Sequence, residues 1–366
     1  MILMNDFKAE PAEIGAAMTD AAARVFASGW YVLGQEVKAF EERWAETCGT
    51  PHCIGVGNGM DAIELALRAL EIGAGDEVIT TPMTAFATTL AIIRAGATPV
   101  LADIESDSGL LALESARRCI SPRTRAIVLV HLYGQVRDIG RWTEFCREHT
   151  IELIEDCAQA HLSCWDGKIA GAFGTAGTYS FYPTKNLGAI GDGGAVVTHR
   201  SDLAERISQL RNYGQSERYR HPFIGMNSRL DELQAAILSE RLRWLPSFTE
   251  RRRAIAQRYD NEIDNPNITL LAPPQQKLAH SYHLYVVLCE RRDALAAHLH
   301  QRGVQTHAHY PIPVHQQQPC LDLRRDSAGL ERSERHAATC LSIPCHPQLG
   351  DESVGRVIDA LNGFQE

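Results

Sequence analysis

The sequence contains no C-x-x-C pair, and nowhere do about 18 apolar residues follow one another. Its ten cysteines are scattered singly, which argues against a zinc site or a disulfide framework and predicts reduced, mostly buried thiols. Residues 1–10 lack a basic stretch leading into an apolar segment with a small-residue cleavage site. We therefore expect a protein that uses no membrane segment and stays in the cytoplasm.

Positive charge is also scarce, with 36 Lys and Arg against 45 Asp and Glu and a formal net charge of -9. This sign is wrong for a protein whose main task is binding nucleic acid, and any anionic ligand needs a local positive pocket. The apolar fraction of 45% is typical of soluble globular proteins. A chain of 366 residues exceeds the usual size of a single core, which predicts two domains.

Short β-rich stretches alternate with helical patterns between residues 52 and 200. This alternation predicts an α/β fold with a mainly parallel sheet covered by helices, and a site at the carboxyl ends of its strands. The expected strands are 52–57, 77–82, 98–104, 125–134, 151–158, 177–183 and 193–199.

The pattern changes after Ser228 to a long helical run over 230–263, which Pro246 is expected to break. Strands are predicted at 281–290 and 303–311, with a helix at 291–303 between them. We therefore expect a large domain over 1–240 and a smaller C-terminal α+β domain over 241–366.

A glycine turn, Gly57-Asn58-Gly59, joins the first of these strands to a helix opened by Met60 and Asp61. Free backbone N–H groups and the helix dipole would meet at this turn, which suits a phosphate group. The alternative is an ordinary strand-to-helix turn in which Asp61 favours the helix start. The residues alone leave both interpretations open.

Glu155 and Asp156 end the apolar run of a predicted central strand, where a carboxylate is costly unless it is paired. Asp156 is suited to pairing with a protonated pyridine nitrogen, although it could also cap the next segment. Lys185 follows another strand and precedes a glycine-rich stretch. Near a carboxylate and away from bulk water, such a lysine can have a lowered pKa and form a Schiff base.

Three segments in this order, GVGNGMDAIELAL, IEDCAQAH and SFYPTKNLGAIGDGG, resemble the DegT/DnrJ/EryC1/StrS family of sugar aminotransferases. The likeness covers nearly the whole chain. It implies the fold of type I aminotransferases, pyridoxal 5'-phosphate as cofactor, L-glutamate as amino donor, a nucleotide-linked keto sugar as acceptor, and a homodimer. PTKNLGAIGDGG together with Gln159 resembles members that act on 3-keto-6-deoxyhexoses more than those that act on 4-keto sugars.

The resemblance implies a role for individual residues. Lys185 and Asp156 are the expected catalytic residues, Lys185 as the Schiff-base lysine and Asp156 as the partner of the pyridine nitrogen. The other expected cofactor contacts are Gly59 and Met60 through their backbone, Ser180 at the phosphate, Ala158 against the ring, Gln159 near the phenolic oxygen, Phe86 over the ring and Asn227 at the phosphate of the partner subunit. The expected substrate-binding residues are Tyr31, Arg229, His309, Tyr310 and His315.

Two of these positions depart from the family pattern. Met60 stands where the family usually has Ser or Thr, so only backbone donors remain there. Ala85 stands where a ring-stacking aromatic is usual, and Phe86 follows it, so Phe86 either covers the ring or belongs to the core. Asn227 also has a local alternative, because Ser228 and Asp231 fit a helix capping box.

Several other interpretations compete with these. His307, His309 and His315 could suggest a metal, but no carboxylate or cysteine has ligand spacing and the family uses HYPIPVH at the substrate, so no metal is predicted. A sugar dehydratase of the superfamily would carry His in place of Lys185. A regulator that binds the cofactor and DNA would need a helix-turn-helix extension, which the sequence does not show. A hydride-transfer enzyme would need the G-x-G-x-x-G spacing, which the GNGMDA turn lacks. The candidate partners of the substrate diphosphate are Arg211, Arg218, Arg220 and Arg229.

Overall fold

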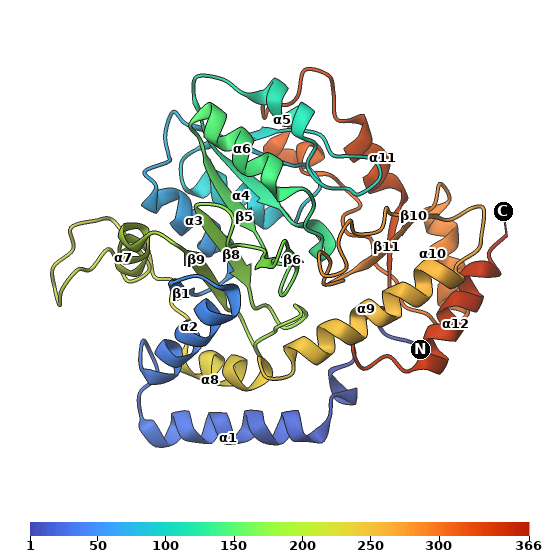
Figure 1. Cartoon of the computed structure of the whole chain (residues 1–366), viewed down its shortest axis with the longest axis horizontal. Coiled ribbons are helices and arrows are strands. Elements are labelled where there is room, and N and C mark those ends of the chain that lie inside the picture. The colour runs from blue at the N-terminus through green and yellow to red at the C-terminus, as the bar shows by residue number, and fades with distance from the viewer. Residues whose placement is uncertain (366) are drawn as a thin grey trace.

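The computed structural model describes residues 1–365 and contains a seven-stranded central sheet of order β1-β9-β8-β5-β4-β2-β3 (Figure 1). Neighbours pair in parallel from β8 to β3, whereas β9 is antiparallel to both β1 and β8. The predicted mainly parallel α/β sheet is therefore confirmed. Its strands are β1 (His52–Val56), β2 (Glu77–Thr80), β3 (Thr98–Leu101), β4 (Thr124–Val130), β5 (Glu152–Asp156), β8 (Ala176–Ser180) and β9 (Gly194–Thr198).

Helices cover both faces of this sheet because successive strand residues point to opposite sides. In β4, Ala126 and Val128 belong to one apolar core and Ile127 and Leu129 to the other. The first core is completed by α3 (Gly59–Ala69), α4 (Phe86–Arg94) and α7 (Ser201–Leu210). The second is completed by α2 (Gln35–Cys48), α5 (Leu113–Cys119), α6 (Ile139–His149) and α8 (Glu232–Arg241).

A second, antiparallel sheet of order β10-β11-β12 lies toward the C-terminus. It consists of β10 (Thr269–Leu270), β11 (Tyr285–Leu288) and β12 (Cys340–Ile343). The accompanying helices are α9 (Leu245–Glu262), α10 (Arg292–Gln301), α11 (Glu331–Thr339) and α12 (Asp351–Asn362). The expected break at Pro246 is confirmed, since α8 ends at Arg241 and Pro246 lies in the first turn of α9. The division into domains 1–240 and 241–366 stays a prediction.

The predicted strand over 303–311 is wrong as a continuous strand. Val304 bridges to Ile2, whereas His307 bridges to Ser342, so the segment changes partner after a few residues. Pro311 has no N–H to continue a ladder. What remains is a loop that lies against the N-terminus at one end and against β12 at the other.

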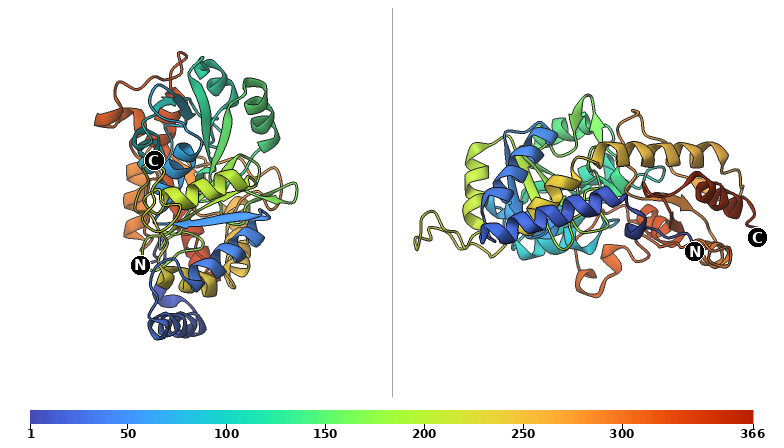
Figure 2. Two further views of the ribbon diagram at one scale, coloured as in Figure 1. Left: turned by 90° about the vertical axis from the view of Figure 1, so that its left-hand side faces the viewer. Right: turned by 90° about the horizontal axis from the view of Figure 1, so that it is seen from below.

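The remaining elements are short or peripheral. α1 (Ala12–Ser28) packs on α8 and lies at the edge of the molecule in Figures 1 and 2. The segment after α7 projects away from the body in both figures. The others are the hairpin β6 (Cys164–Trp165) and β7 (Lys168–Ile169), and the 3-10 helices η1 (Phe7–Ala9), η2 (Leu132–Gly134), η3 (Val314–Gln316) and η4 (Gln318–Cys320).

Two buried carboxylates connect the C-terminal part of the chain to the central sheet. Asp326 accepts hydrogen bonds from Arg118 and Ser115, and Asp103 accepts the N–H of Arg332 and of Ser333. The loop that precedes Asp326 in the chain is thereby held beside the edge of the sheet.

All ten cysteines are free thiols, nine of them buried, as the sequence predicted. Within residues 1–365, no helix combines the length and the apolar character that crossing a bilayer requires.

Candidate active site

Asp156 ends β5 with its side chain in a buried, hydrogen-bonded position. Its Oδ2 accepts a hydrogen bond from Thr88 Oγ1 at 2.8 Å, and its Oδ1 accepts one from the N–H of Ala158 at 3.1 Å. Thr88 is in turn 2.7 Å from Thr84 through the two hydroxyl groups. The carboxylate is therefore oriented from two sides while retaining lone pairs for another donor. Thr88 was not predicted, because nothing local in TPMTAFATT shows that α4 packs beside the end of β5.

Glu155, the neighbour of Asp156, points to the opposite side of the strand and is completely buried. Its oxygens accept hydrogen bonds from His131 at 2.9 Å and from the N–H groups of Gly171, Phe173 and Gly174 at 2.8 Å each. Burial alone would raise the pKa of Glu155, but His131 and the N–H groups of Gly171 and Gly174 lower it below the ordinary value. His131, Glu155 and Cys157 lie close enough together to suggest a metal site. The four donors on Glu155 instead mark it as a structural carboxylate.

Lys185 lies in the turn after β8, which ends at Ser180, slightly before the end of the predicted strand 177–183. The turn is closed by a hydrogen bond of 2.8 Å from the N–H of Lys185 to the carbonyl of Tyr182. Burial lowers the pKa of Lys185 to about 8, against the opposing effect of the Asp156 charge. The structure thus brings the two predicted catalytic residues together, and about a tenth of the lysine is a neutral amine at pH 7, far more than at the ordinary pKa.

Residues on both sides of the turn fix the backbone that carries Lys185. Asn186 Nδ2 donates to the carbonyl of Ser281 at 3.0 Å, and the N–H of Leu187 donates to His161 Nδ1 at 3.3 Å. His161 is fully buried between Tyr179 and Phe181, and burial followed by the Lys185 charge lowers its pKa to about 3. A neutral imidazole is therefore the acceptor that holds this loop.

The glycine turn lies directly against the end of β8. A Cβ on Gly59 would be 2.6 Å from Ser180 Cβ, so only glycine allows the first residue of α3 to approach Ser180 this closely. Asn58 caps the helix by accepting the N–H of Asp61 at 2.8 Å, a role that the sequence interpretation did not assign. Met60 packs against the apolar core, which leaves the backbone N–H groups as the donors of this turn.

The capping box considered for Ser228 and Asp231 is wrong. α8 begins at Glu232, and Ser228 Oγ instead accepts the N–H of Gly57 at 2.9 Å. This bond holds the segment of Asn227 beside the glycine turn. Asn227 itself is exposed and forms a bridge with Asn212.

Gln159 connects the end of β5 to the predicted substrate loop. Its Oε1 accepts the N–H of Tyr133 at 2.6 Å, and its Nε2 donates to Tyr310 Oη at 3.3 Å. Tyr133 Oη donates to the carbonyl of His309 at 2.6 Å. Burial, and then the Asp156 charge, raises the pKa of Tyr310 to about 12, so its hydroxyl stays protonated. Gln159, His309 and Tyr310 are thus brought to the same place as Asp156.

Other predicted residues have partners elsewhere in the chain. His315 is buried and lies 2.9 Å from Glu334, whereas His309 Nδ1 is 2.8 Å from Ser342 Oγ, so these two histidines have separate partners. Phe86 packs against the cluster Leu101, Val314, Cys320 and Leu330. That packing favours the second of the two alternatives, in which Phe86 belongs to the core.

The arginines considered for the diphosphate also differ in their surroundings. Arg211 is engaged by Glu41 and by the carbonyl of Gly55. Arg229 donates to Asn212 Oδ1 at 3.0 Å and lies over the ring of Tyr213. Arg218 and Arg220 are exposed on the projecting segment.

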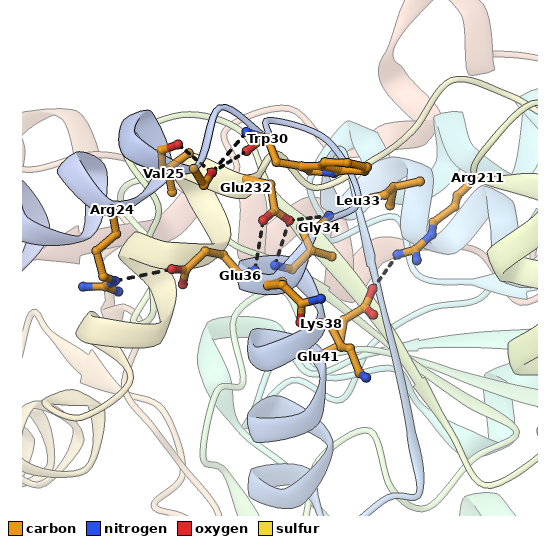
Figure 3. Close-up of a pocket in the computed structure, with 13 residues that line it drawn as sticks. Arg24, Val25, Trp30, Leu33, Gly34, Glu36, Lys38, Glu41, Arg211 and Glu232 are labelled. Carbon is orange, nitrogen blue, oxygen red and sulfur yellow. Dashed lines mark hydrogen bonds and ion pairs between the residues drawn. The ribbon is translucent and has the colours of Figure 1, made fainter.

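The loop between α1 and α2, which carries Tyr31, is held by Glu232 at the start of α8. Figure 3 shows the Glu232 carboxylate directed at the backbone of Gly34 and Glu36. It accepts three N–H groups, those of Gly34, Glu36 and Val37, at 2.7 to 2.9 Å. A Cβ on Gly34 would lie 2.6 Å from the Trp30 ring, so the loop and the carboxylate fit closely.

A cavity of about 460 Å³ lies beneath this loop (Figure 3). Trp30, Leu33, Lys38 and Arg211 are among its lining residues, and the Trp30 indole N–H is fixed by the carbonyl of Val32 at 2.7 Å. Tyr31 is 55% exposed and lies outside the lining.

Replacing Glu232 by Gln is expected to reduce the free energy of unfolding by about 2–4 kcal/mol. The reason is that hydrogen bonds to a charged group contribute more than neutral ones, and buried N–H groups left without an acceptor are costly. Urea denaturation measures the change. Glu13→Gln, at an exposed position of α1, is the matched control and should shift stability by less than about 0.5 kcal/mol. Equal stability of the two variants would contradict the role given to Glu232.

The chain is similar to known proteins over nearly its whole length. Residues 12–362 match the model of the DegT/DnrJ/EryC1/StrS aminotransferase family. The chain is 44% identical to dTDP-3-amino-3,4,6-trideoxy-alpha-D-glucose transaminase of Streptomyces venezuelae, over 99% of this chain and 95% of that protein. It is 45% identical to dTDP-3-amino-3,6-dideoxy-alpha-D-galactopyranose transaminase of Aneurinibacillus thermoaerophilus, over 93% of both.

Solved structures agree with the sequence relatives. The crystal structure of S. venezuelae DesV in complex with a ketimine intermediate superimposes with a TM-score of 0.95 at 43% identity, over 99% of this chain and 97% of that one. NtdA of Bacillus subtilis, with bound cofactor PMP, superimposes with a TM-score of 0.88 at 27% identity, over 96% of this chain and 82% of that one. The predicted fold of type I aminotransferases is confirmed by these neighbours.

Proposed function

The chain belongs to the DegT/DnrJ/EryC1/StrS aminotransferase family, and from this premise we propose that it transfers an amino group from L-glutamate to a nucleotide-linked 3-keto-6-deoxyhexose. The observation that carries the proposal is Lys185 beside Asp156, a partly buried lysine with a lowered pKa next to an oriented carboxylate. Sequence relatives named as transaminases of dTDP-linked 3-amino sugars support the choice of acceptor.

The residues of the site fit pyridoxal phosphate. The close approach of Gly59 to Ser180 leaves a turn of backbone N–H groups and a hydroxyl side by side, which suits the phosphate. Asp156 would hold a proton on the pyridine nitrogen, since its carboxylate is oriented by Thr88 and by the N–H of Ala158. When bound, the cofactor supplies an electron sink for the carbon that loses or gains the amino group.

In the proposed mechanism the chain contributes binding and proton transfer. With the cofactor bound, Lys185 Nζ would hold it through its carbonyl carbon, and the same amine would move a proton at the carbon that bears the amino group. Its lowered pKa keeps a neutral amine available for both tasks. The contacts of Asn186 and Leu187 hold the backbone that carries Lys185, and the Tyr310 hydroxyl, which remains protonated, is available as a donor on the substrate side.

The acceptor is tested with a panel of nucleotide-linked keto sugars and L-glutamate, followed by mass spectrometry of the amino sugar. A nucleotide-linked 3-keto-6-deoxyhexose should react far better than the free sugar, because binding energy from the nucleotide positions the carbonyl. If a 4-keto isomer reacts faster, the acceptor carbonyl lies at C4 of the sugar and not at C3. If free keto sugars or simple keto acids react as fast as the nucleotide-linked sugars, the acceptor is not a nucleotide sugar.

We further propose that the active unit is a homodimer in which Asn227 of one protomer serves the site of the other. The segment between α7 and α8 supports this: it projects from the body and carries strongly exposed apolar side chains, with Tyr219 82% and Ile224 88% exposed. The exposed Asn227 lies at the base of the same segment.

We also propose a cytoplasmic location, which the free state of all ten cysteines supports.

Mixing inactive Lys185→Ala and Asn227→Asp protomers should restore about a quarter of wild-type activity. Half of the dimers would be mixed, and one of their two sites would contain two intact residues, as two-fold symmetry requires. Activity is measured after joint unfolding and refolding, with each variant treated alone as the control. No recovery in the mixture would place both residues in the site of a single protomer.

A further inference from the structure

His283 is a residue beside Lys185 that the sequence interpretation did not single out. It lies just before β11, and its Nδ1 is 3.3 Å from Oδ1 of Asn186, the residue that follows Lys185. The C-terminal part of the chain therefore places an imidazole next to the loop of the reacting lysine, from a position 97 residues further along the sequence than Asn186.

The contact with Asn186 fixes the tautomer of this ring. Asn186 Nδ2 donates to the carbonyl of Ser281 at 3.0 Å, so the oxygen of the amide is the atom that faces His283. An amide oxygen only accepts, and His283 Nδ1 must therefore carry the hydrogen. Nε2 is left with its lone pair, and within residues 1–365 it has no hydrogen-bond partner.

The surroundings keep His283 neutral. Burial first, and then the charges of Lys185 and Arg252 and the neighbouring His309 and His161, lower its pKa well below the ordinary value of 6.5. The ring therefore feels the charge of Lys185 and the neighbouring His309 of the predicted substrate loop, and it offers an acceptor without a charge.

An unprotonated His283 Nε2 needs a ligand that donates a hydrogen bond. A phosphate or carboxylate oxygen has no hydrogen to donate at neutral pH, and the amino group of the donor is consumed in the reaction. A sugar hydroxyl is a donor that remains throughout. We propose that His283 is a specificity-determining residue whose Nε2 accepts a hydrogen bond from a hydroxyl on a carbon next to the reacting carbonyl of the sugar. This inference rests on the proposed function.

The two half-reactions of the purified holoenzyme separate this role from a structural one. His283→Phe keeps a ring but has no acceptor, and it should reduce kcat/KM for the nucleotide keto sugar by about tenfold to a hundredfold, the effect expected for one hydrogen bond. The half-reaction with L-glutamate should change by less than about threefold. His283→Gln, which restores an acceptor, should recover part of the loss. His300→Gln, at an exposed position of α10, is the matched control for both half-reactions.

An equal fall in both half-reactions would overturn the proposal, because His283 would then serve Lys185 and not the sugar. An unchanged sugar half-reaction would also overturn it. If the wild-type enzyme aminates no nucleotide keto sugar at all, the proposed function fails instead, and the two failures are thereby distinguished.

Nuclear magnetic resonance of the wild-type protein, labelled with ¹⁵N in histidine and free of cofactor, gives a readout that needs neither turnover nor a variant. We expect a His283 ring with hydrogen on Nδ1 and an unprotonated Nε2 across neutral pH. A dTDP-linked 6-deoxyhexose should shift the Nε2 resonance, whereas L-glutamate should not. The opposite tautomer, or an Nε2 resonance unmoved by the sugar nucleotide, would contradict the inference.

Discussion

Lys185→Ala should abolish transamination, with a fall in turnover of about 10⁴-fold or more in both half-reactions, because the variant loses both the nucleophile and the group that moves the proton. The fold should persist, since within residues 1–365 the Lys185 side chain forms no hydrogen bond or ion pair with another residue. Stopped-flow measurement of each half-reaction, supplied with pyridoxamine phosphate or with L-glutamate, gives the change. Lys168→Ala, at an exposed position of β7, should behave as wild type.

The lowered pKa of the same lysine can be observed without turnover. In cofactor-free protein, the rate at which an amine-specific reagent labels Lys185 should rise with pH around a midpoint near 8, against an ordinary value of 10.5. Only the neutral amine reacts, and burial favours that form. Peptide mass spectrometry resolves the site. A midpoint at the ordinary value, or borohydride fixation of the cofactor at another lysine, would remove Lys185 from its proposed role.

Asp156→Asn should reduce turnover by about 10²- to 10³-fold, which is the cost of removing one preorganised charge from a buried site. The neutral amide cannot hold a proton on the pyridine nitrogen, and the ring becomes a poorer electron sink. Circular dichroism and cofactor content should remain close to wild type, because the amide oxygen can still accept from Thr88 or from the N–H of Ala158.

Two further variants make the test of Asp156 specific. Thr88→Val removes one donor to the carboxylate and should have a smaller effect, about tenfold, through orientation alone. Asp20→Asn removes a carboxylate from an exposed position of α1 and should leave turnover unchanged. Near-normal turnover of Asp156→Asn would show that the carboxylate does not act on the cofactor.

The sequence by itself determined the succession of strands and helices in the central sheet and the two residues at the centre of the site. Strand periodicity and the glycine turn are local properties, so the places of β1, β5 and β8 along the chain could be predicted without a fold, although β8 ends three residues earlier than predicted. Because the carboxyl ends of parallel strands meet at one edge, Asp156 and Lys185 could also be expected to lie close together.

The tertiary structure alone decided which side chains hold the loops of the molecule in place. Glu232 accepts the N–H of Gly34 across 198 residues, and His283 meets Asn186 across 97. The capping box at Ser228 failed for the same reason, since its hydroxyl accepts the N–H of Gly57, which lies 171 residues earlier in the chain. A short sequence pattern reports only which partners are near along the chain, whereas a buried polar group bonds to whichever donor or acceptor packing brings within about 3 Å.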